Sequence, residues 1–464
     1  MGKIDSLIRT KLRLPFTRPA LVLRPRLQEQ IAQGLRGPLT LITAPAGFGK
    51  TTLVASCITG CEMPVAWLSL DKNDNQEEGF LNYLIAALQG VDGQIGDGAA
   101  QLMAGVQPAP PEAVLTSLIN DLDIAGGEIV LVLDDYHFIS NQAVHEGVTF
   151  LLEHCPNTLH VVIATRSDPP LPLVRLRARG QTVELRAADL RFTEPEAAKF
   201  LNEVMGLSLD ARSVAVLEAR TEGWITGLQM ASIAVQAKLG QQSHLSIRNR
   251  NDVLEFIEGF SGTNRYILDY LLEEVLANQP PEIQRFLLST SILERLTAPL
   301  CEAVLEAGNF EDWKVGENLS TDQGSNLLTC QQMLEYLERA NLFLVPLDDE
   351  RQWYRYHNLF SDLLRTQLQK ILVDTEVARL HMRASEWYEE NHSFLEAIHH
   401  ASLACDFENV ERLIEQNYVE MMNHGELSWV RFWMVKLSKE LVIRRPWLCL
   451  YEAGSRSWFG RIEE

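Results

Sequence analysis

One short segment constrains this chain more than any other, the run Ala44-Pro45-Ala46-Gly47-Phe48-Gly49-Lys50-Thr51-Thr52. It lies between an apolar run at 38–43 and a helix-compatible stretch at 53–58. A strand, a glycine-rich turn with Gly-Lys-Thr and a helix together form the phosphate-binding loop of nucleoside triphosphatases. Ala44 stands where the usual pattern has glycine, which is a tolerated variant. The alternative is a chance turn rich in glycine and alanine.

The residue types of this loop fit phosphate chemistry. Small residues allow consecutive backbone N–H groups to point at phosphate oxygens, and the helix N-terminus adds its partial positive charge. We expect Lys50 to reach the β- and γ-phosphates and the Thr51 hydroxyl to ligate Mg²⁺. The predicted nucleotide-binding residues in the loop are Ala46, Gly47, Phe48, Gly49, Lys50, Thr51 and Thr52.

A second motif lies at 128–136, where an apolar run ends in Asp134 and Asp135. A continuous apolar run of this length fits a strand buried on both faces of a parallel sheet. Asp134 is then placed to hold Mg²⁺, directly or through water, and Asp135 to orient or deprotonate the attacking water. A buried strand followed by an acidic turn is the simpler alternative.

Arg166 follows a fourth apolar run at 159–164. An arginine at the carboxyl edge of a strand beside the phosphate site can sense the γ-phosphate. A surface arginine paired with an acidic neighbour would show the same pattern. We therefore predict Lys50, Asp134, Asp135 and Arg166 as the catalytic group, with Thr51 and Asp134 as the Mg²⁺ ligands.

Composition limits the class of protein. The 464 residues allow about three or four domains. No apolar stretch reaches the roughly 18 residues that a membrane span needs, and the seven scattered cysteines favour a reducing cytoplasm. Residues 1–36 carry a formal charge of +6 and the remainder −27. Such an acidic body does not favour the DNA phosphate backbone.

The order of apolar and helical patterns predicts a doubly wound α/β domain with a parallel sheet. From about residue 190 the strands stop, and Thr193-Glu194-Pro195-Glu196 opens a helix with a capping box. Residues 376–464 resemble the start of a helical-repeat array, or else an ordinary helical bundle. The expected strands lie at 39–43, 65–70, 129–133, 159–164 and 182–186, and the expected helices of this domain include 77–90, 111–123 and 142–154.

These motifs, taken together, resemble the N-terminal part of the MalT-like transcriptional activators that end in a LuxR-type DNA-binding domain. Those proteins belong to the STAND class of signal-transduction ATPases. Ordered matches run from about residue 10 to 450. Besides the loop, the matching segments are 132–137, 164–170, 222–228, 340–348, 353–360 and 445–448.

The resemblance implies five parts in order along the chain. They are an N-terminal lead-in segment (1–37), a P-loop nucleotide-binding domain (38–188), a small helical domain (189–265), a winged-helix domain (266–374) and a helical arm that begins TPR-like repeats (375–464). It also implies that His357, in the winged helix, touches the ADP phosphates and latches a closed state. A histidine packed beside Tyr356 and Phe360 is the alternative. Gly223-Trp224-Ile225 and 22–24 would lie near the adenine.

The function implied is an ATP-binding switch of a transcriptional regulator. ADP holds the closed resting state, ATP with an unknown inducer opens it and permits self-association, and slow ATP hydrolysis resets it. DNA would be bound only through a C-terminal domain beyond residue 464, and no membrane is involved. A P-loop ATPase or a nucleotide-binding adaptor with no transcriptional role is the alternative.

Overall fold

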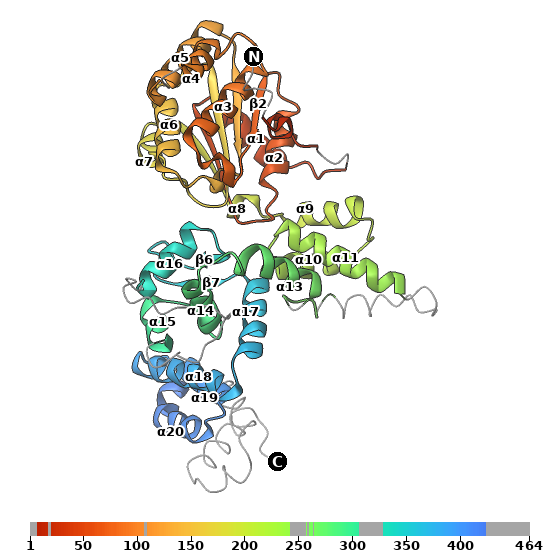
Figure 1. Ribbon diagram of the computed structural model, residues 1–464. Helices are drawn as coiled ribbons and strands as arrows, with labels where there is room; N and C mark the ends of the chain where they lie inside the picture. The colour runs from red at the N-terminus through yellow and green to blue at the C-terminus, as the bar shows by residue number, and fades with distance from the viewer. Residues whose placement is uncertain are drawn as a thin grey trace. The chain divides into compact units, whose positions relative to one another are not determined.

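The computed structural model describes residues 7–16, 20–105, 109–241, 257, 259–262, 264–305 and 328–423. The chain forms two compact units, which are described separately. The first comprises Met1–Val275 together with Tyr336–Phe343, and the second comprises Leu276–Glu335 and Leu344–Glu464. Figure 1 shows the elements of each unit in chain order. In the described part of the chain, no helix is both long and apolar enough to cross a membrane.

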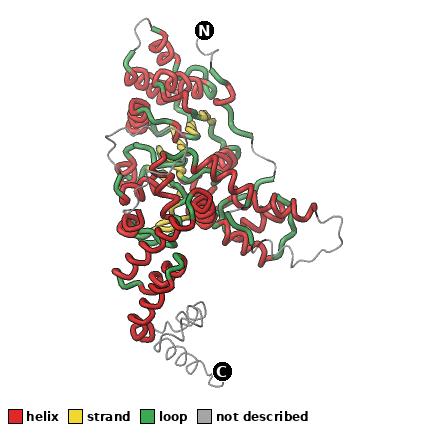
Figure 2. The backbone as a smooth tube through the Cα atoms, turned by 60° about the horizontal axis from the view of Figure 1, so that its bottom comes forward, coloured by secondary structure: helices red, strands yellow, loops and turns green. Residues whose placement is uncertain are grey.

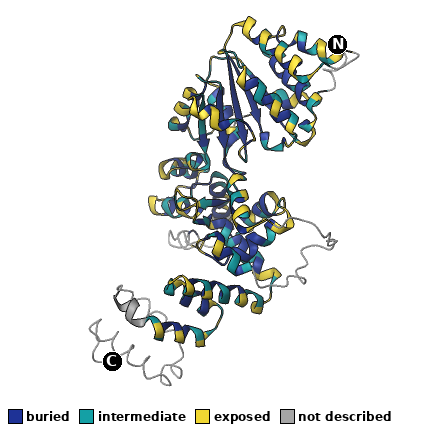
Figure 3. Ribbon diagram, turned by 90° about the vertical axis from the view of Figure 1, so that its left-hand side faces the viewer, coloured by how far each residue is buried: buried dark blue, intermediate teal, exposed yellow. Residues whose placement is uncertain are grey.

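A five-stranded sheet forms the centre of the first unit, and every pairing in it is parallel. The strand order is β2-β3-β4-β1-β5. Most strand residues are buried and dark blue in Figure 3, except in the edge strand β5, where Leu185 is buried and the other residues are of intermediate burial. All five predicted strands are confirmed, with ends shifted by one residue at most: β1 (Leu39–Thr43), β2 (Val65–Ser69), β3 (Ile129–Asp134), β4 (Leu159–Thr165) and β5 (Thr182–Arg186).

Helices cover both faces of this sheet, as the doubly wound prediction requires (Figure 1). One face packs against α3, α5, α6 and α7 through a single apolar cluster that includes Leu131 and Leu133. The other face is turned to α1 and α2, which contact β1, β4 and β5. Side chains alternate along a strand, so Asp134 has the parity of Val132 and faces the α2 side. The elements are η2 (Arg9–Leu12), α1 (Pro25–Gly34), α2 (Lys50–Ile58), η3 (Lys72–Asn75), α3 (Glu77–Gln89), α4 (Asp97–Ala104), α5 (Pro111–Ala125), η4 (Tyr136–Phe138), α6 (Gln142–Glu153) and α7 (Leu173–Ala178).

A helical segment follows the sheet. The helix predicted to open at Thr193 is present, and the Glu196 carboxylate accepts a hydrogen bond from the Thr193 N–H at 3.0 Å. The same carboxylate pairs with Arg24 and Arg26, which ties the lead-in segment to this helix. The elements are α8 (Ala187–Leu190), α9 (Glu194–Lys199), η5 (Phe200–Val204), α10 (Ala211–Thr221), α11 (Ile225–Gln241), α13 (Arg265–Leu271) and η7 (Leu272–Leu276).

The second unit is mainly helical, but it also contains a small antiparallel hairpin of β6 (Leu344–Pro346) and β7 (Tyr354–Tyr356). Figure 2 shows strands in yellow among the helices in red. The prediction that strands stop near 190 is therefore wrong, because three-residue strands are too short to give an alternating pattern. The helices are α14 (Pro281–Thr290), α15 (Ala298–Leu305), α16 (Cys330–Arg339), α17 (Asn358–Ile371), α18 (Asp374–Glu390), α19 (Phe394–Leu403) and α20 (Phe407–Asn423). The last turn of α16 belongs to the first unit.

The arm expected from residue 375 begins with three consecutive helices, in which α19 packs on both α18 and α20. Its residues 424–464 lie outside the described residues. A buried histidine pair joins the first two helices, with His381 Nδ1 and His400 Nδ1 2.9 Å apart. One ring must donate and the other accept, so the two rings cannot both be protonated while this hydrogen bond is present. The Ser385 hydroxyl also donates to the Ala397 carbonyl oxygen across this interface at 2.7 Å.

This pair makes stability depend on pH. Burial lowers the pKa of His381 to about 4, and the nearby His399 and Arg365 add to this shift. Burial also lowers the pKa of His400 to about 3, and His381 and His399 add to that shift. The ordinary pKa of histidine is 6.5. As the pH falls, these two histidines are therefore protonated in the unfolded chain before they are protonated in the folded chain. The contribution of this pair to the free energy of unfolding is therefore complete above about pH 6.5. It falls toward pH 4 by about 1.4 kcal/mol per pH unit for each histidine.

Thermal unfolding between about pH 7.5 and about pH 5 measures this loss. The double variant His381→Gln/His400→Gln keeps neutral hydrogen-bonding groups and should show a flatter pH dependence. His154→Gln, at an exposed position of the first unit, should leave the slope unchanged. An equally steep slope in the double variant would contradict the assignment.

Candidate functional site

The loop between β1 and α2 has the backbone that its glycines predict. Gly47 and Gly49 have φ of 74° and 75°, in the left-handed region that favours glycine. Gly49 is the residue before the first turn of α2, which starts at Lys50. A Cβ on Gly47 would lie 2.5 Å from the Thr226 hydroxyl oxygen. This position therefore requires glycine both for its φ and for the close approach of α11.

Lys50 is buried at the mouth of this loop, with 7% of its surface exposed. Its ammonium donates to the carbonyl oxygens of Ala44 at 2.9 Å and Pro45 at 3.0 Å. Burial, and then the nearby Arg166 guanidinium, lowers its pKa to about 8, while Asp135 and Asp134 oppose the shift. An anion beside this ammonium would raise its pKa again.

Thr51 and Asp134, the predicted Mg²⁺ ligands, lie side by side. The Thr51 hydroxyl donates to Asp134 Oδ1 at 3.0 Å, and the same oxygen accepts the Asp135 N–H at 3.0 Å. Two adjacent ligands of an octahedral Mg²⁺ with bonds of about 2.1 Å are about 3 Å apart, so this pair fits the ion. Burial, and then the Asp135 carboxylate, raises the pKa of Asp134 to about 6, and a cation would relieve that cost.

Asp135 and Arg166 lie near this pair. Asp135 has a left-handed backbone, with φ of 56°, and directly follows the last residue of β3. Burial raises the pKa of Asp135, against the opposing effects of Lys50 and Arg166. The structure therefore brings the four predicted catalytic side chains into one charged group at the carboxyl edge of the sheet.

Arg166 already has partners in this structure. Its guanidinium lies 3.5 Å from a carboxylate oxygen of Glu274 in η7, and both side chains are partly exposed. Its carbonyl oxygen accepts a hydrogen bond from the Asn341 side chain at 3.0 Å. A surface ion pair of this kind contributes little to stability, so a phosphate can compete with Glu274 for the guanidinium.

Three side chains from outside the sheet contact the loop. The Trp224 indole N–H donates to the Ala46 carbonyl oxygen at 3.2 Å, and the Thr226 hydroxyl donates to that of Gly47 at 2.8 Å. The Phe343 ring lies 6.3 Å from the Phe48 ring and 5.3 Å from the Trp224 ring, measured between centroids. The loop is thus in contact with segments that lie about 180 and 295 residues further along the chain.

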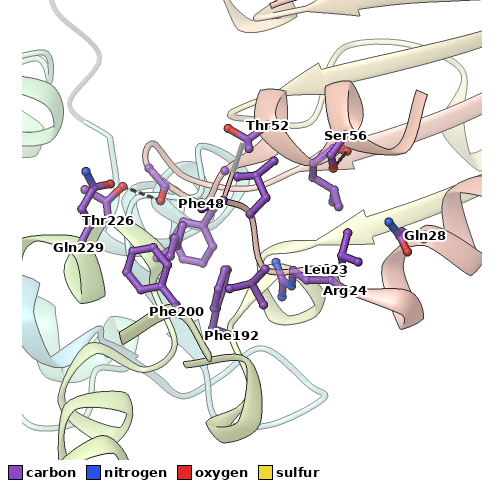
Figure 4. A pocket seen from close by; sticks show the side chains of 17 residues that line it. Leu23, Arg24, Gln28, Phe48, Thr52, Ser56, Phe192, Phe200, Thr226 and Gln229 are labelled. Carbon is purple, nitrogen blue, oxygen red and sulfur yellow. Dashed lines mark hydrogen bonds between the residues drawn. The ribbon is translucent and has the colours of Figure 1, made fainter. Parts of the chain in front are cut away.

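A cavity of 260 Å³ opens beside the loop. Its walls are largely apolar, and Figure 4 shows Phe48, Phe192 and Phe200 near one another, with Thr52 and Ser56 coming from α2. The segments expected near the adenine contribute to it through 22–24 and Ile225. Arg24 has a structural role as well, since its guanidinium donates to the Arg191 carbonyl oxygen at 2.7 Å and stacks on Phe192.

The remaining predicted residue, His357, belongs to the second unit, so its role at the phosphates stays a prediction. It precedes α17 and is buried. The sequence interpretation missed Thr226, Glu274, Asn341 and Phe343. Each comes from a helical or loop segment with no chemical motif, and only the packing brings it to the loop. Thr226, Asn341 and Phe343 lie in segments that carry the resemblance, which assigned no role to them; Asn341 and Phe343 have positive φ of 49° and 55°.

The parallel sheet, the glycine loop and the paired carboxylates define a P-loop NTPase fold that continues into a largely helical segment. Residues 272–376 match the family described as the MalT winged helix domain. The chain is therefore MalT-like, and it carries a MalT-type winged-helix domain. The predicted order of an α/β domain, a helical domain and a winged helix is confirmed.

Full-length relatives extend this similarity beyond the winged helix. The chain is 34% identical over 447 residues to the HTH-type transcriptional regulator MalT of Serratia proteamaculans, which covers 96% of this chain and 46% of that protein. It is 31% identical over 444 residues to the serine/threonine-protein kinase PknK of Mycobacterium tuberculosis, covering 95% of this chain and 37% of the kinase. The chain thus spans less than half the length of either relative.

Two solved structures are more distant. A STAND protein with a tetratricopeptide repeat sensor from Pyrococcus horikoshii is 14% identical, with a TM-score of 0.35 over 97% of this chain and 57% of its own. A Walker-type ATPase of Pyrococcus abyssi is 14% identical, with a TM-score of 0.47 over 77% of this chain and 100% of its own.

The two adjacent carboxylates should have separable roles. Asp134→Asn removes a charge from the predicted Mg²⁺ site and should weaken Mg²⁺-dependent ATP binding about tenfold or more, whereas Asp135→Asn should leave binding within about twofold and slow hydrolysis roughly 100-fold. Nucleotide titrations with and without Mg²⁺, together with single-turnover hydrolysis, measure both effects. Identical effects of the two substitutions on binding and on hydrolysis would remove the assignment.

Proposed function

We propose that this chain is the nucleotide-operated switch of a cytoplasmic transcriptional regulator. The observation that supports it is the set formed by Lys50, the Thr51–Asp134 pair, Asp135 and Arg166 at one edge of the sheet. ATP and ADP with Mg²⁺ are the ligands that this set and the adjoining apolar cavity fit. The phosphates would lie against residues 46–52, and the base would enter the cavity.

Each side chain has a distinct part in that proposal. Lys50 leaves the loop carbonyl oxygens and contacts the β- and γ-phosphates, where the negative charge keeps it protonated. Thr51 and Asp134 hold Mg²⁺, which neutralises phosphate charge when it is bound. Asp135 orients the attacking water, and the Arg166 guanidinium leaves Glu274 and contacts the γ-phosphate.

A switch also needs a way to transmit the state of the nucleotide. The loop is bonded to Trp224 and Thr226 and lies against Phe343, so a ligand that moves the loop acts on segments outside the sheet. We propose that ADP stabilises a closed resting state and that ATP with an unidentified inducer favours an open state that self-associates. Slow hydrolysis resets it. The ligand shifts this equilibrium only by its differential affinity for the two states.

Two different outputs are candidates for the proposed switch. The same region matches a protein named as a transcriptional regulator and one named as a protein kinase. A nucleotide-binding module with no transcriptional role is therefore the second candidate. For a regulator, specific DNA binding would come from a part outside this chain, since the body beyond residue 36 carries −27.

A steady-state assay separates a switch from a metabolic ATPase. We expect slow turnover, well below the median enzyme rate of about 10 per second, with ADP retained after purification. Lys50→Ala is the control, and it should weaken nucleotide binding roughly 100-fold because it removes a charge-assisted contact to phosphate. Rapid turnover with no retained nucleotide would favour an enzyme, and unchanged affinity in the Lys50 variant would remove the loop as the site.

The predicted latch has its own test. His357→Ala should speed ADP release by about 5- to 150-fold, the range expected for one differential contact of about 1–3 kcal/mol to phosphate. Stopped-flow chase of a fluorescent ADP analogue measures the rate. His392→Ala, at an exposed position of the same unit, is the control. Release at the original rate would leave His357 with a packing role only.

A further inference from the structure

A groove in the first unit is separate from the phosphate loop. Its volume is 790 Å³, and it is lined by α5, by α6 and by the segment 170–172 that follows β4. These helices lie on the face of the sheet that also carries α3 and α7 (Figure 1). None of the described residues that line it belongs to the loop or to the cavity beside the loop. The groove is therefore a second feature of this unit.

The floor of the groove is apolar. Leu115 is 1% exposed and Leu171 is 9% exposed, and Phe150 is partly buried. Two lining positions one turn apart on α6 have a methyl group or no side chain, Ala143 and Gly147. A Cβ on Gly147 would make only an ordinary contact, at 3.5 Å from Leu115 Cδ1. Packing does not require glycine there, although glycine weakens a helix interior relative to alanine, so the hollow fits a side chain from another molecule.

The walls of the groove are rigid. Two prolines at 110–111 begin α5, and Pro170 and Pro172 come from the segment after β4. A proline ring fixes φ, and the Leu171 N–H also donates to the Pro169 carbonyl oxygen at 2.8 Å. A groove that is already formed loses little conformational entropy when it binds a ligand.

The rim of the groove is acidic. Four glutamates line it, Glu77, Glu112, Glu146 and Glu153, and its described lining includes no lysine, arginine or histidine. Glu153 is paired with Arg175 at 2.5 Å, whereas the other three form no ion pair among the described residues. Helix N-termini favour Glu77 and Glu112, which lie in first turns, but Glu146 lies in the second turn of α6. A cationic partner would relieve the repulsion between these carboxylates.

We propose that this groove binds a basic, amphipathic peptide segment of a partner protein, in which arginine or lysine side chains flank one or two large apolar side chains. The apolar side chains enter the hollow over Leu115 and Gly147, and the cations meet Glu112 and Glu146. The apolar floor favours such a segment over a simple polycation, and the acidic rim repels acidic partners. The inference does not rest on the proposed function, because the groove shares no residue with the nucleotide site.

The probe for the test is a fluorescently labelled synthetic peptide in which arginines flank one leucine and one phenylalanine. Anisotropy titrations measure its binding to the 464-residue chain at low and at moderate salt. Glu112→Gln/Glu146→Gln removes two rim charges and keeps the side-chain size, and Gly147→Leu fills the hollow. Glu62→Gln/Glu128→Gln, at exposed positions of the same unit outside the groove, is the matched control. Melting temperatures check that each variant is folded.

We expect Glu112→Gln/Glu146→Gln to weaken peptide binding about three- to tenfold at low salt, the range for two exposed ion pairs. The difference should shrink at moderate salt, because salt screens exposed charges. Gly147→Leu should weaken binding at both salt concentrations, and the control variant should change it less than about twofold. A peptide with serine in place of both apolar residues should bind roughly fivefold more weakly or worse, since it buries no apolar surface on the floor.

Three results would overturn the inference. Equal weakening by the groove and control double variants would mean that the peptide binds the acidic surface as a whole. Equal affinity for the serine peptide would indicate a site for simple polycations. A dimer of the unmodified chain that the groove variants dissociate, measured by sedimentation, would assign the groove to a second copy of this chain. Nucleotide titrations of the same variants should match the unmodified chain, so failure of this inference is distinguishable from failure of the proposed function.

Discussion

Buried charge at the carboxyl edge of the parallel sheet is the constraint on which the rest of this structure depends. Asp134 is 2% exposed, and the shift of its pKa from 3.8 to about 6 corresponds to about 3 kcal/mol against its ionised form. Lys50 is shifted in the opposite sense for the same reason. The fold therefore keeps acidic and basic groups together where phosphates and a divalent cation would stabilise both.

The sheet makes this arrangement possible because it is buried on both faces. The alternation of side chains along β3 sends Leu131 and Leu133 into the apolar cluster and Asp134 toward α2. The carboxylate then meets Thr51 in the first turn of that helix. A shift of one residue in β3 would place Asp134 against the apolar cluster, so the site requires this register.

The loop contacts segments that lie far from it in the sequence. Trp224 and Thr226 come from the helical segment, and Phe343 lies within the match to the MalT winged helix. The nucleotide loop is thus bonded to or packed on parts of the chain that have no phosphate chemistry of their own. Relatives named as a transcriptional regulator and as a serine/threonine-protein kinase are similar to this chain over this region.

The sequence by itself determined the five strands, the phosphate loop and the two carboxylates, because these depend on local periodicity and on residue types at fixed spacing. It did not determine the hairpin of β6 and β7, whose strands are too short for a pattern. Nor did it determine the Glu274 and Asn341 contacts to Arg166, or the acidic groove lined by α5 and α6. Those depend on which distant segments meet, and only tertiary packing decides that.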